Sequence, residues 1–252
     1  MNTPSVILLH GQPGDRSDWD DVVARLPASV HALAWDRPGY GVNRSGASTL
    51  ADNADWLLER FDRAGIRDAV LVGHSYGGGV ALAAAAMAPE RVRGLVLIAS
   101  VGPGCVTRWD ELLAAPVAGP MLSMTAWTVL PWMARQCGGG VVRGRSSASP
   151  SLRALASIRH DHGQVWRSFL TEQRELLRGM DHWIARLEGH SIPTLILADP
   201  ADKVVPVSTA HALHDRFPRS RLELVGAGGH HLPRKAPSVI AAKLGEFAHT
   251  LD

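Results

Sequence analysis

The sequence has few of the features that mark secreted, nucleic-acid-binding or metal-binding proteins. Only two of its 252 residues are cysteines, and its formal net charge is +2. No run of five or more basic residues occurs, which argues against a nucleic-acid partner. The opening "MNTPSVILLHG" lacks a cationic leader and a cleavage site, so we expect no secretory signal. We therefore expect a cytoplasmic protein in which Cys105 and Cys137 are reduced, with no metal and no cofactor.

One long stretch lacks charge altogether. Between Leu112 and Ala134 the chain reads "LLAAPVAGPMLSMTAWTVLPWMA", which is long enough to span a bilayer. Three prolines and a glycine interrupt this stretch, and the chain has no second run of the same kind. We therefore predict short buried helices and no stable membrane span. A lid that faces lipid or substrate is the alternative interpretation.

Apolar runs alternate with helical patterns over most of the chain. The runs are apolar on both faces, as in a parallel sheet that is covered by helices on both sides. They lie at 5–10, 30–36, 68–74, 93–100, 193–199 and 221–227. The helical patterns lie at about 18–26, 49–64, 76–88, 207–216 and 236–249. This order predicts an α/β fold with a mostly parallel sheet of about six strands.

The alternation stops between Ala99 and Ile192. No comparable strand pattern occurs there, although five of the eight tryptophans do. We predict a helical cap at 103–191, inserted into a core that is formed by 1–102 and 192–252.

The stretch "LVGHSYGGGV" places a serine between glycines, after a strand pattern and before an alanine-rich helix pattern. A sharp strand-to-helix turn holds such a serine in a strained conformation and lifts its hydroxyl clear of the sheet. Gly73 and Gly77 leave room where larger side chains would collide. Gly78 lets the helix lie close to neighbouring strands. Ser75 is therefore the candidate nucleophile.

A serine hydroxyl needs a base to take its proton. His230 and His231 follow the last predicted strand, at the edge where open α/β sheets bind ligands. Asp199 stands where the preceding strand ends and could serve a turn, whereas Asp202 lies further out in the loop. We favour His230 as base and Asp202 as its orienting acid, with His231 and Asp199 as the alternatives. The chain order is then Ser, Asp, His.

Acyl transfer also needs donors for the developing oxyanion. The segment "HGQPG" follows the first predicted strand. We expect the backbone N–H groups of Gln12 and Tyr76 to converge beside the Ser75 hydroxyl. An ordinary strand-to-helix turn is the alternative interpretation of "HGQPG".

Together these segments resemble the α/β-hydrolase superfamily. The matching segments, in order, are "HGQPG", "DRPGYG", "GHSYGG", "DKVVP" and "GGHH". In that family the acid commonly precedes an apolar-apolar-proline run, which implies Asp202. The histidine commonly follows glycine and precedes a helix that starts with proline, here Pro237, which implies His230. The chain begins near the strand that the family usually counts third, so we expect no opening antiparallel hairpin and an edge strand at 30–36.

The resemblance implies a serine hydrolase that acts on small, fairly apolar carboxylic esters through an acyl-enzyme. Trp127, Trp132, Met121 and Met124 are candidates for an apolar pocket wall, with packing inside the cap as the alternative. The expected partner is a small-molecule substrate, and the oligomeric state stays open.

Other reactions occur on the same triad in this superfamily. They include carbon–carbon bond hydrolysis, lactone hydrolysis, perhydrolase chemistry and cofactor-free lyase chemistry. Serine at position 75, where aspartate would serve, argues against dehalogenase or epoxide hydrolase chemistry. A ligand-binding or scaffold protein without activity is a further alternative, because a fold alone does not define a function.

Overall fold

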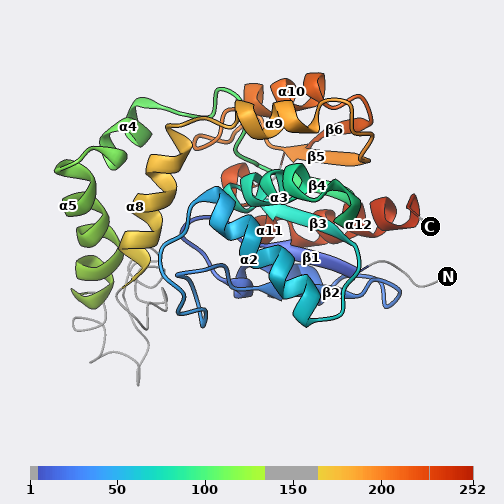
Figure 1. Ribbon diagram of the computed structural model, residues 1–252, viewed down its shortest axis with the longest axis horizontal. Coiled ribbons are helices and arrows are strands. Elements are labelled where there is room, and N and C mark those ends of the chain that lie inside the picture. Colours follow the sequence, from blue (N-terminus) through green and yellow to red (C-terminus); the bar gives the residue numbers. More distant parts are fainter. Residues whose placement is uncertain (1–4, 134–163, 227, 252) are drawn as a thin grey trace.

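The computed structural model describes residues 5–133, 164–226 and 228–251. Within them, six strands form one sheet in the order β2-β1-β3-β4-β5-β6, and every neighbouring pair is parallel (Figure 1). The strands are β1 (Ser5–Leu9), β2 (Ala32–Trp35), β3 (Ala69–His74), β4 (Val92–Ile98), β5 (Thr194–Ala198) and β6 (Ser220–Leu224). The predicted α/β fold is confirmed, and the strand predicted at 30–36 forms the edge of the sheet.

Helices cover both faces of the sheet. Successive strand residues point to opposite faces, so Leu71 joins one apolar cluster and Val70 and Val72 join the other. The first cluster includes α2 (Leu50–Arg63), α3 (Tyr76–Met87), α9 (Asp181–Leu187) and α10 (Val207–Arg216). The second includes η1 (Arg16–Trp19), α1 (Asp20–Val23), α11 (Leu232–Lys235) and α12 (Pro237–His249). Burial on both sides explains why the strands read as unbroken apolar runs.

An inserted helical region lies between β4 and β5, at one side of the sheet (Figure 1). Its elements are α4 (Arg108–Ala114), α5 (Ala118–Met124), the π-helical turn η3 (Thr125–Val129) and α8 (Val165–Leu176). Helix α9 also falls within the predicted 103–191 insertion, but it packs on α3 in the core, where Trp183 and Ile184 are buried.

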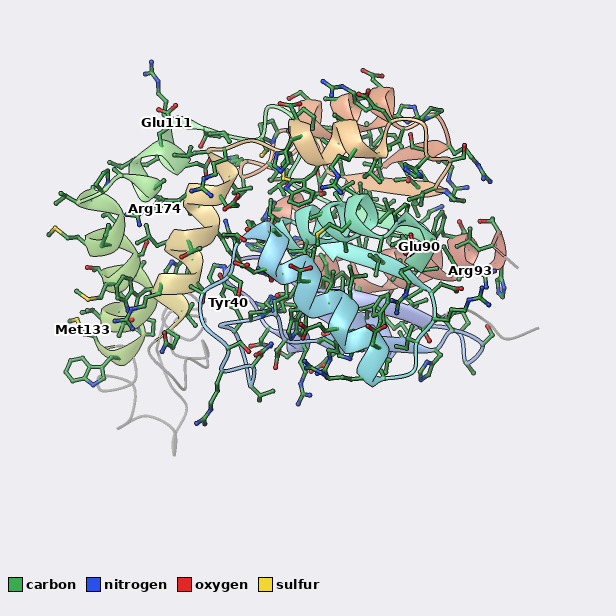
Figure 2. All side chains as sticks on the ribbon, viewed as in Figure 1. Tyr40, Glu90, Arg93, Glu111, Met133 and Arg174 are labelled. Atoms are coloured by element: carbon green, nitrogen blue, oxygen red, sulfur yellow. The ribbon has the colours of Figure 1, made fainter. Side chains whose placement is uncertain are left out.

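The prediction of short buried helices for the uncharged stretch is wrong about burial. Val117 and Met121 are 73% and 63% exposed, and Trp132 is 56% exposed. The helices are short, but they are covered mainly along one stripe. Gly119 and Ser123 are buried on that stripe, where α5 meets α8, and the opposite face of α5 is open. Figure 2 shows Met133, beyond η3, pointing away from the sheet.

The same segment bears on the expectation of no membrane span. No single described helix is long and apolar enough to cross a bilayer. The pair Arg108–Ala114 and Ala118–Met133 reaches that length and composition only when taken together, and it is bent by 91°.

Candidate active site

Ser75 occupies the turn between β3 and α3 in a strained conformation. Its φ is 53° and its ψ is −122°, a combination that L-residues rarely adopt. The side chain is held at the carboxyl end of β3, where the neighbouring parallel strands also end. The strained turn predicted from "GHSYGG" is therefore present.

The glycines around Ser75 are required by close backbone contacts. A Cβ atom on Gly73 would lie 2.3 Å from the Gly77 carbonyl oxygen. One on Gly77 would lie 2.3 Å from the Leu9 carbonyl oxygen. One on Gly78 would lie 2.1 Å from Ser100 Oγ, beyond β4. The absence of side chains at these positions lets α3 pack directly on β1, β3 and β4, as predicted.

Three side chains from separate loops form one hydrogen-bonded chain. Ser75 Oγ lies 3.0 Å from His230 Nε2, and His230 Nδ1 lies 2.9 Å from Asp202 Oδ2. The Nδ1–H donates to the carboxylate, which leaves Nε2 free to accept the serine proton. Ser75 and His230 are 155 residues apart in the chain. This arrangement can raise the nucleophilicity of the serine.

The carboxylate of Asp202 is held on both oxygens. While Oδ2 meets His230, Oδ1 accepts the backbone N–H groups of Val204 and Val205 at 2.7 and 3.0 Å. Partial burial alone would raise the pKa of Asp202, but hydrogen bonds from His230 and from these two N–H groups lower it overall. Asp202 is therefore charged near neutral pH and oriented toward the imidazole.

Asp199, the alternative acid, has a different place. It is buried, and its Oδ2 accepts the backbone N–H groups of Gly228 and Gly229 at 2.9 and 2.8 Å. Its Oδ1 accepts the Ala201 N–H at 2.7 Å. Asp199 thus ties the loop after β5 to the segment that carries His230. The sequence suggested a turn residue or the alternative acid for Asp199, and it did not indicate these hydrogen bonds from Gly228 and Gly229.

Two further histidines flank the candidate base. His74 Nε2 lies 2.8 Å from the carbonyl oxygen of His230, so Nε2 carries the proton and donates it. Burial, and then the neighbouring His230, lower the pKa of His74 to about 3, so it stays neutral. His231 is exposed at the surface, and partial desolvation, followed by the neighbouring His230, lowers its pKa as well. The sequence did not indicate the tether from His74, because the contact reaches a backbone carbonyl 156 residues away.

The two expected oxyanion donors come from adjoining segments. Tyr76 is the first residue of α3, so its N–H has no acceptor within the helix. Gly11, which precedes Gln12, lies close to the nucleophile, since a Cβ on Gly11 would be 3.1 Å from Ser75 Cβ. Among the described residues, no acceptor takes up the backbone N–H of Gln12 or Tyr76. Their role as donors stays a prediction.

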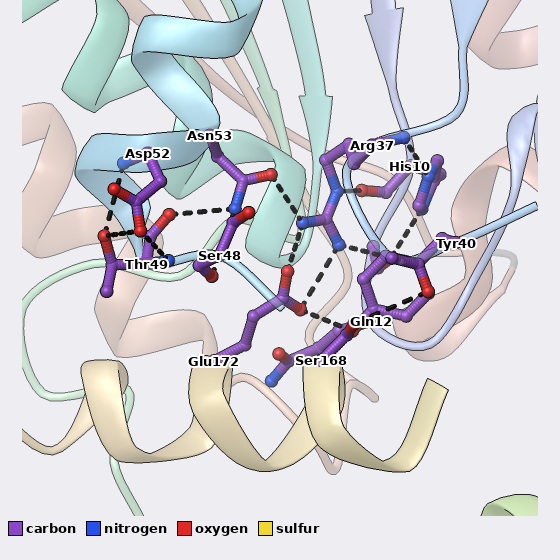
Figure 3. Close-up of polar contacts among 12 residues, drawn as sticks. His10, Gln12, Arg37, Tyr40, Ser48, Thr49, Asp52, Asn53, Ser168 and Glu172 are labelled. Carbon is purple, nitrogen blue, oxygen red and sulfur yellow. Dashed lines mark hydrogen bonds and ion pairs between the residues drawn. The ribbon is translucent and has the colours of Figure 1, made fainter. Parts of the chain in front are cut away.

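A buried charged network supports this corner of the sheet (Figure 3). Arg37, from "DRPGYG", is fully buried and forms an ion pair with Glu172 of α8. Asn53 Oδ1 accepts from Arg37 at 3.3 Å, and the Tyr40 hydroxyl donates to Glu172 at 2.7 Å. Burial alone would lower the pKa of Arg37, but the carboxylate of Glu172 raises it overall. Sequence reasoning missed this pair, whose members are 135 residues apart.

The four residues predicted to line a pocket lie on α5, η3 and the segment after it. Trp127 packs on Phe169 of α8, with ring centroids 5.4 Å apart. Met121, Met124 and Trp132 are exposed, and no described contact joins them to the triad. Their pocket role stays a prediction.

The structure describes one of the two cysteines. Cys105 is a buried free thiol, and burial raises its pKa. Cys137 lies outside the described residues. Among the described residues, no group of three His, Cys, Asp or Glu side chains could hold a metal ion.

The chain belongs to the alpha/beta hydrolase family, whose sequence model matches residues 6–243. It is 31% identical to the pimeloyl-[acyl-carrier protein] methyl ester esterase of Aromatoleum aromaticum, over 91% of this chain and 92% of that protein. It is 27% identical to the 2-hydroxymuconate semialdehyde hydrolase of Pseudomonas sp. (strain CF600), over 98% of this chain and 87% of that protein.

Solved structures agree with the fold. The haloalkane dehalogenase DbeA from Bradyrhizobium elkani matches with a TM-score of 0.78 and 21% identity, over 99% of this chain and 91% of that chain. At this identity the likeness concerns the arrangement of helices and strands alone.

Proposed function

We propose that the protein is a serine hydrolase that cleaves small, fairly apolar carboxylic esters. The observation that carries the proposal is the hydrogen-bonded chain from Ser75 Oγ through His230 to Asp202, with separations of 3.0 and 2.9 Å. The likeness to a methyl ester esterase supports the choice of ester bonds.

The geometry supports the following sequence of steps. Ser75 Oγ attacks the ester carbonyl carbon while His230 Nε2 takes the hydroxyl proton, and the carbonyl π electrons move to oxygen. The backbone N–H groups of Gln12 and Tyr76 stabilise that oxyanion. The tetrahedral intermediate collapses, His230 gives its proton to the leaving alcohol, and an acyl-enzyme forms. Water, deprotonated by His230, then releases the acid and restores Ser75.

A second reaction class keeps the same residues. The likeness to a 2-hydroxymuconate semialdehyde hydrolase over 98% of this chain favours hydrolysis of a carbon–carbon bond in a vinylogous diketone. Water again completes the reaction, but the leaving group is carbon.

The test is turnover of a substrate panel by purified protein. Short-chain p-nitrophenyl esters, lactones and a vinylogous diketone are compared on wild type, Ser75→Ala and Ser45→Ala. Ser45 is an exposed loop serine and serves as the matched control. We expect ester turnover that survives Ser45→Ala and is lost in Ser75→Ala. Ester turnover that persists in Ser75→Ala contradicts the proposal. Faster turnover of the diketone selects the second reaction class.

A further inference from the structure

The loop that carries Gln12 lies against the nucleophile. A Cβ atom on Gly11 would lie 3.1 Å from Ser75 Cβ and 3.1 Å from His74 Nδ1. The direction of the Gln12 N–H therefore depends on how the preceding peptide is held. An oxyanion donor acts only within hydrogen-bond reach of the developing charge, and a misplacement of about 1 Å can cost about 100-fold in rate.

Arg37 donates hydrogen bonds to the backbone carbonyl groups of His10 and Gly11, the two residues before Gln12. Its Nε donates to the His10 carbonyl at 2.9 Å, and its Nη2 donates to the Gly11 carbonyl at 2.9 Å. The Arg37 backbone N–H donates to His10 Nε2 at 3.0 Å. His10 Nδ1 therefore carries the ring proton and donates to the Gly11 carbonyl at 2.8 Å. The guanidinium carbon also lies 5.0 Å from the ring centroid of Tyr76, which carries the second proposed donor.

Two neighbouring residues of α8, Glu172 and Gln173, complete the arrangement, and Figure 3 shows Glu172 beside Arg37. Glu172 pairs with the buried guanidinium of Arg37 and accepts the Tyr40 hydroxyl. Gln173 Oε1 accepts from Gln12 Nε2 at 3.1 Å. Helix α8 therefore contacts this loop in two ways. Glu172 acts through Arg37, and Gln173 bonds directly to the side chain of Gln12.

We propose that Glu172 and Gln173 are positioning residues that keep the loop of residues 10–12 in register with Ser75. The proposal rests on the proposed serine hydrolase function. Neither side chain needs to touch the reacting atoms. Both residues lie on one turn of α8. The position of α8 against the sheet therefore controls the direction of the Gln12 N–H, and with it the rate of acyl transfer.

The test uses an ester and its thiono analogue, in which sulfur replaces the carbonyl oxygen. Sulfur is a weaker hydrogen-bond acceptor, so oxyanion-hole donors favour the oxygen ester more strongly. We expect Glu172→Gln and Gln173→Ala to lower kcat for the oxygen ester by about tenfold or more, with a smaller change in KM. The thionoester should lose less, so the ratio of the two rates falls. A loss of folded protein would lower both rates equally and leave the ratio unchanged.

Glu175→Gln is the matched control, because Glu175 lies on the same helix and pairs with the exposed Arg178. Its rate ratio should equal that of the wild type. Glu172→Gln leaves the charge of Arg37 buried and unpaired, so Gln173→Ala decides the matter if the first variant does not fold. A folded variant of Glu172 or Gln173 with the wild-type ratio overturns the assignment for that residue.

Different results would contradict the serine hydrolase function and the positioning role of Glu172 and Gln173. A folded wild-type protein that hydrolyses no ester, and whose Ser75 is not labelled by a fluorophosphonate, contradicts the serine hydrolase function itself. A wild type that hydrolyses both esters, with ratios unchanged in both variants, contradicts the positioning role alone.

Discussion

The side of the sheet at which the parallel strands end, here called the carboxyl edge, differs from the inserted helices in how far its side chains are buried. At the carboxyl edge, Tyr76 is fully buried and Ser75 nearly so, and the candidate triad is joined by hydrogen bonds across three loops. On the insertion, Met121 and Trp132 are largely exposed. The edge therefore tolerates little displacement, whereas much of the insertion has an open face. Helix α8 of the insertion contacts this edge through buried polar groups.

The largest expected effect separates two aspartates at the edge. Asp202→Asn should lower kcat by about 10⁴-fold with little change in stability, because the amide no longer favours the tautomer in which His230 Nε2 accepts a proton. Asp199→Asn should mainly lower the melting temperature, because Asp199 accepts three backbone N–H groups. Steady-state kinetics and thermal melts of both variants check this. A larger kinetic loss in Asp199→Asn would reverse the roles of the two carboxylates.

The next effect tests the space around the turn. Gly77→Ala should lower the free energy of unfolding by about 3 kcal/mol, since its methyl group would meet the Leu9 and His10 carbonyls. Gly46→Ala is the control, because a Cβ there meets nothing within 4 Å. Urea unfolding measures both. Equal free energies of unfolding for the two variants would contradict the close packing of Gly77 against the Leu9 and His10 carbonyls.

The effect of acid on stability tests the buried histidines. His74 has a pKa of about 3 when folded and about 6.5 when unfolded, so the unfolded chain binds the extra proton between these values. Stability is therefore full above pH 6.5 and falls as the pH is lowered, by about 2 kcal/mol at pH 5 from His74 alone. Urea unfolding between pH 7 and 5 gives the free energy of unfolding at each pH. This free energy should fall less steeply with falling pH for His74→Gln than for wild type.

His31→Asn is the control for that experiment, because His31 is exposed on the surface. The free energy of unfolding of His31→Asn should change with pH as steeply as that of the wild type. If the free energy of unfolding of His74→Gln depends on pH as steeply as that of the wild type, His74 binds a proton as readily in the folded protein as in the unfolded chain, which contradicts the lowered pKa.

The smallest effect is expected on the open face of the insertion. Met121→Gln should change the free energy of unfolding by less than about 0.5 kcal/mol, because the side chain is 63% exposed. Leu71→Ala in the sheet should cost about 2–5 kcal/mol. Chemical denaturation of both variants checks the contrast. A cost for Met121→Gln that approaches that of Leu71→Ala would show that this face is covered in solution.

The same contrast explains what the sequence could predict. The strands and the turn at Ser75 were predictable because burial on both faces and the need for glycine leave local patterns. The choice of Asp202 and His230 followed from segment order and from the family resemblance. The pairing of Arg37 with Glu172 left no local sign, since a buried ion pair between distant segments depends on how α8 docks. The exposure of Met121 was missed because apolar composition alone does not show which face of a helix is covered.

The proposed function depends on Ser75 being a nucleophile that His230 activates. The most direct measurement is the intact mass and peptide map of the protein after reaction with a fluorophosphonate, which forms a covalent bond with an activated serine. We expect one adduct, located on Ser75, which is absent in Ser75→Ala and forms much more slowly in His230→Ala. An adduct at another residue, or none on well-folded wild-type protein, would contradict it.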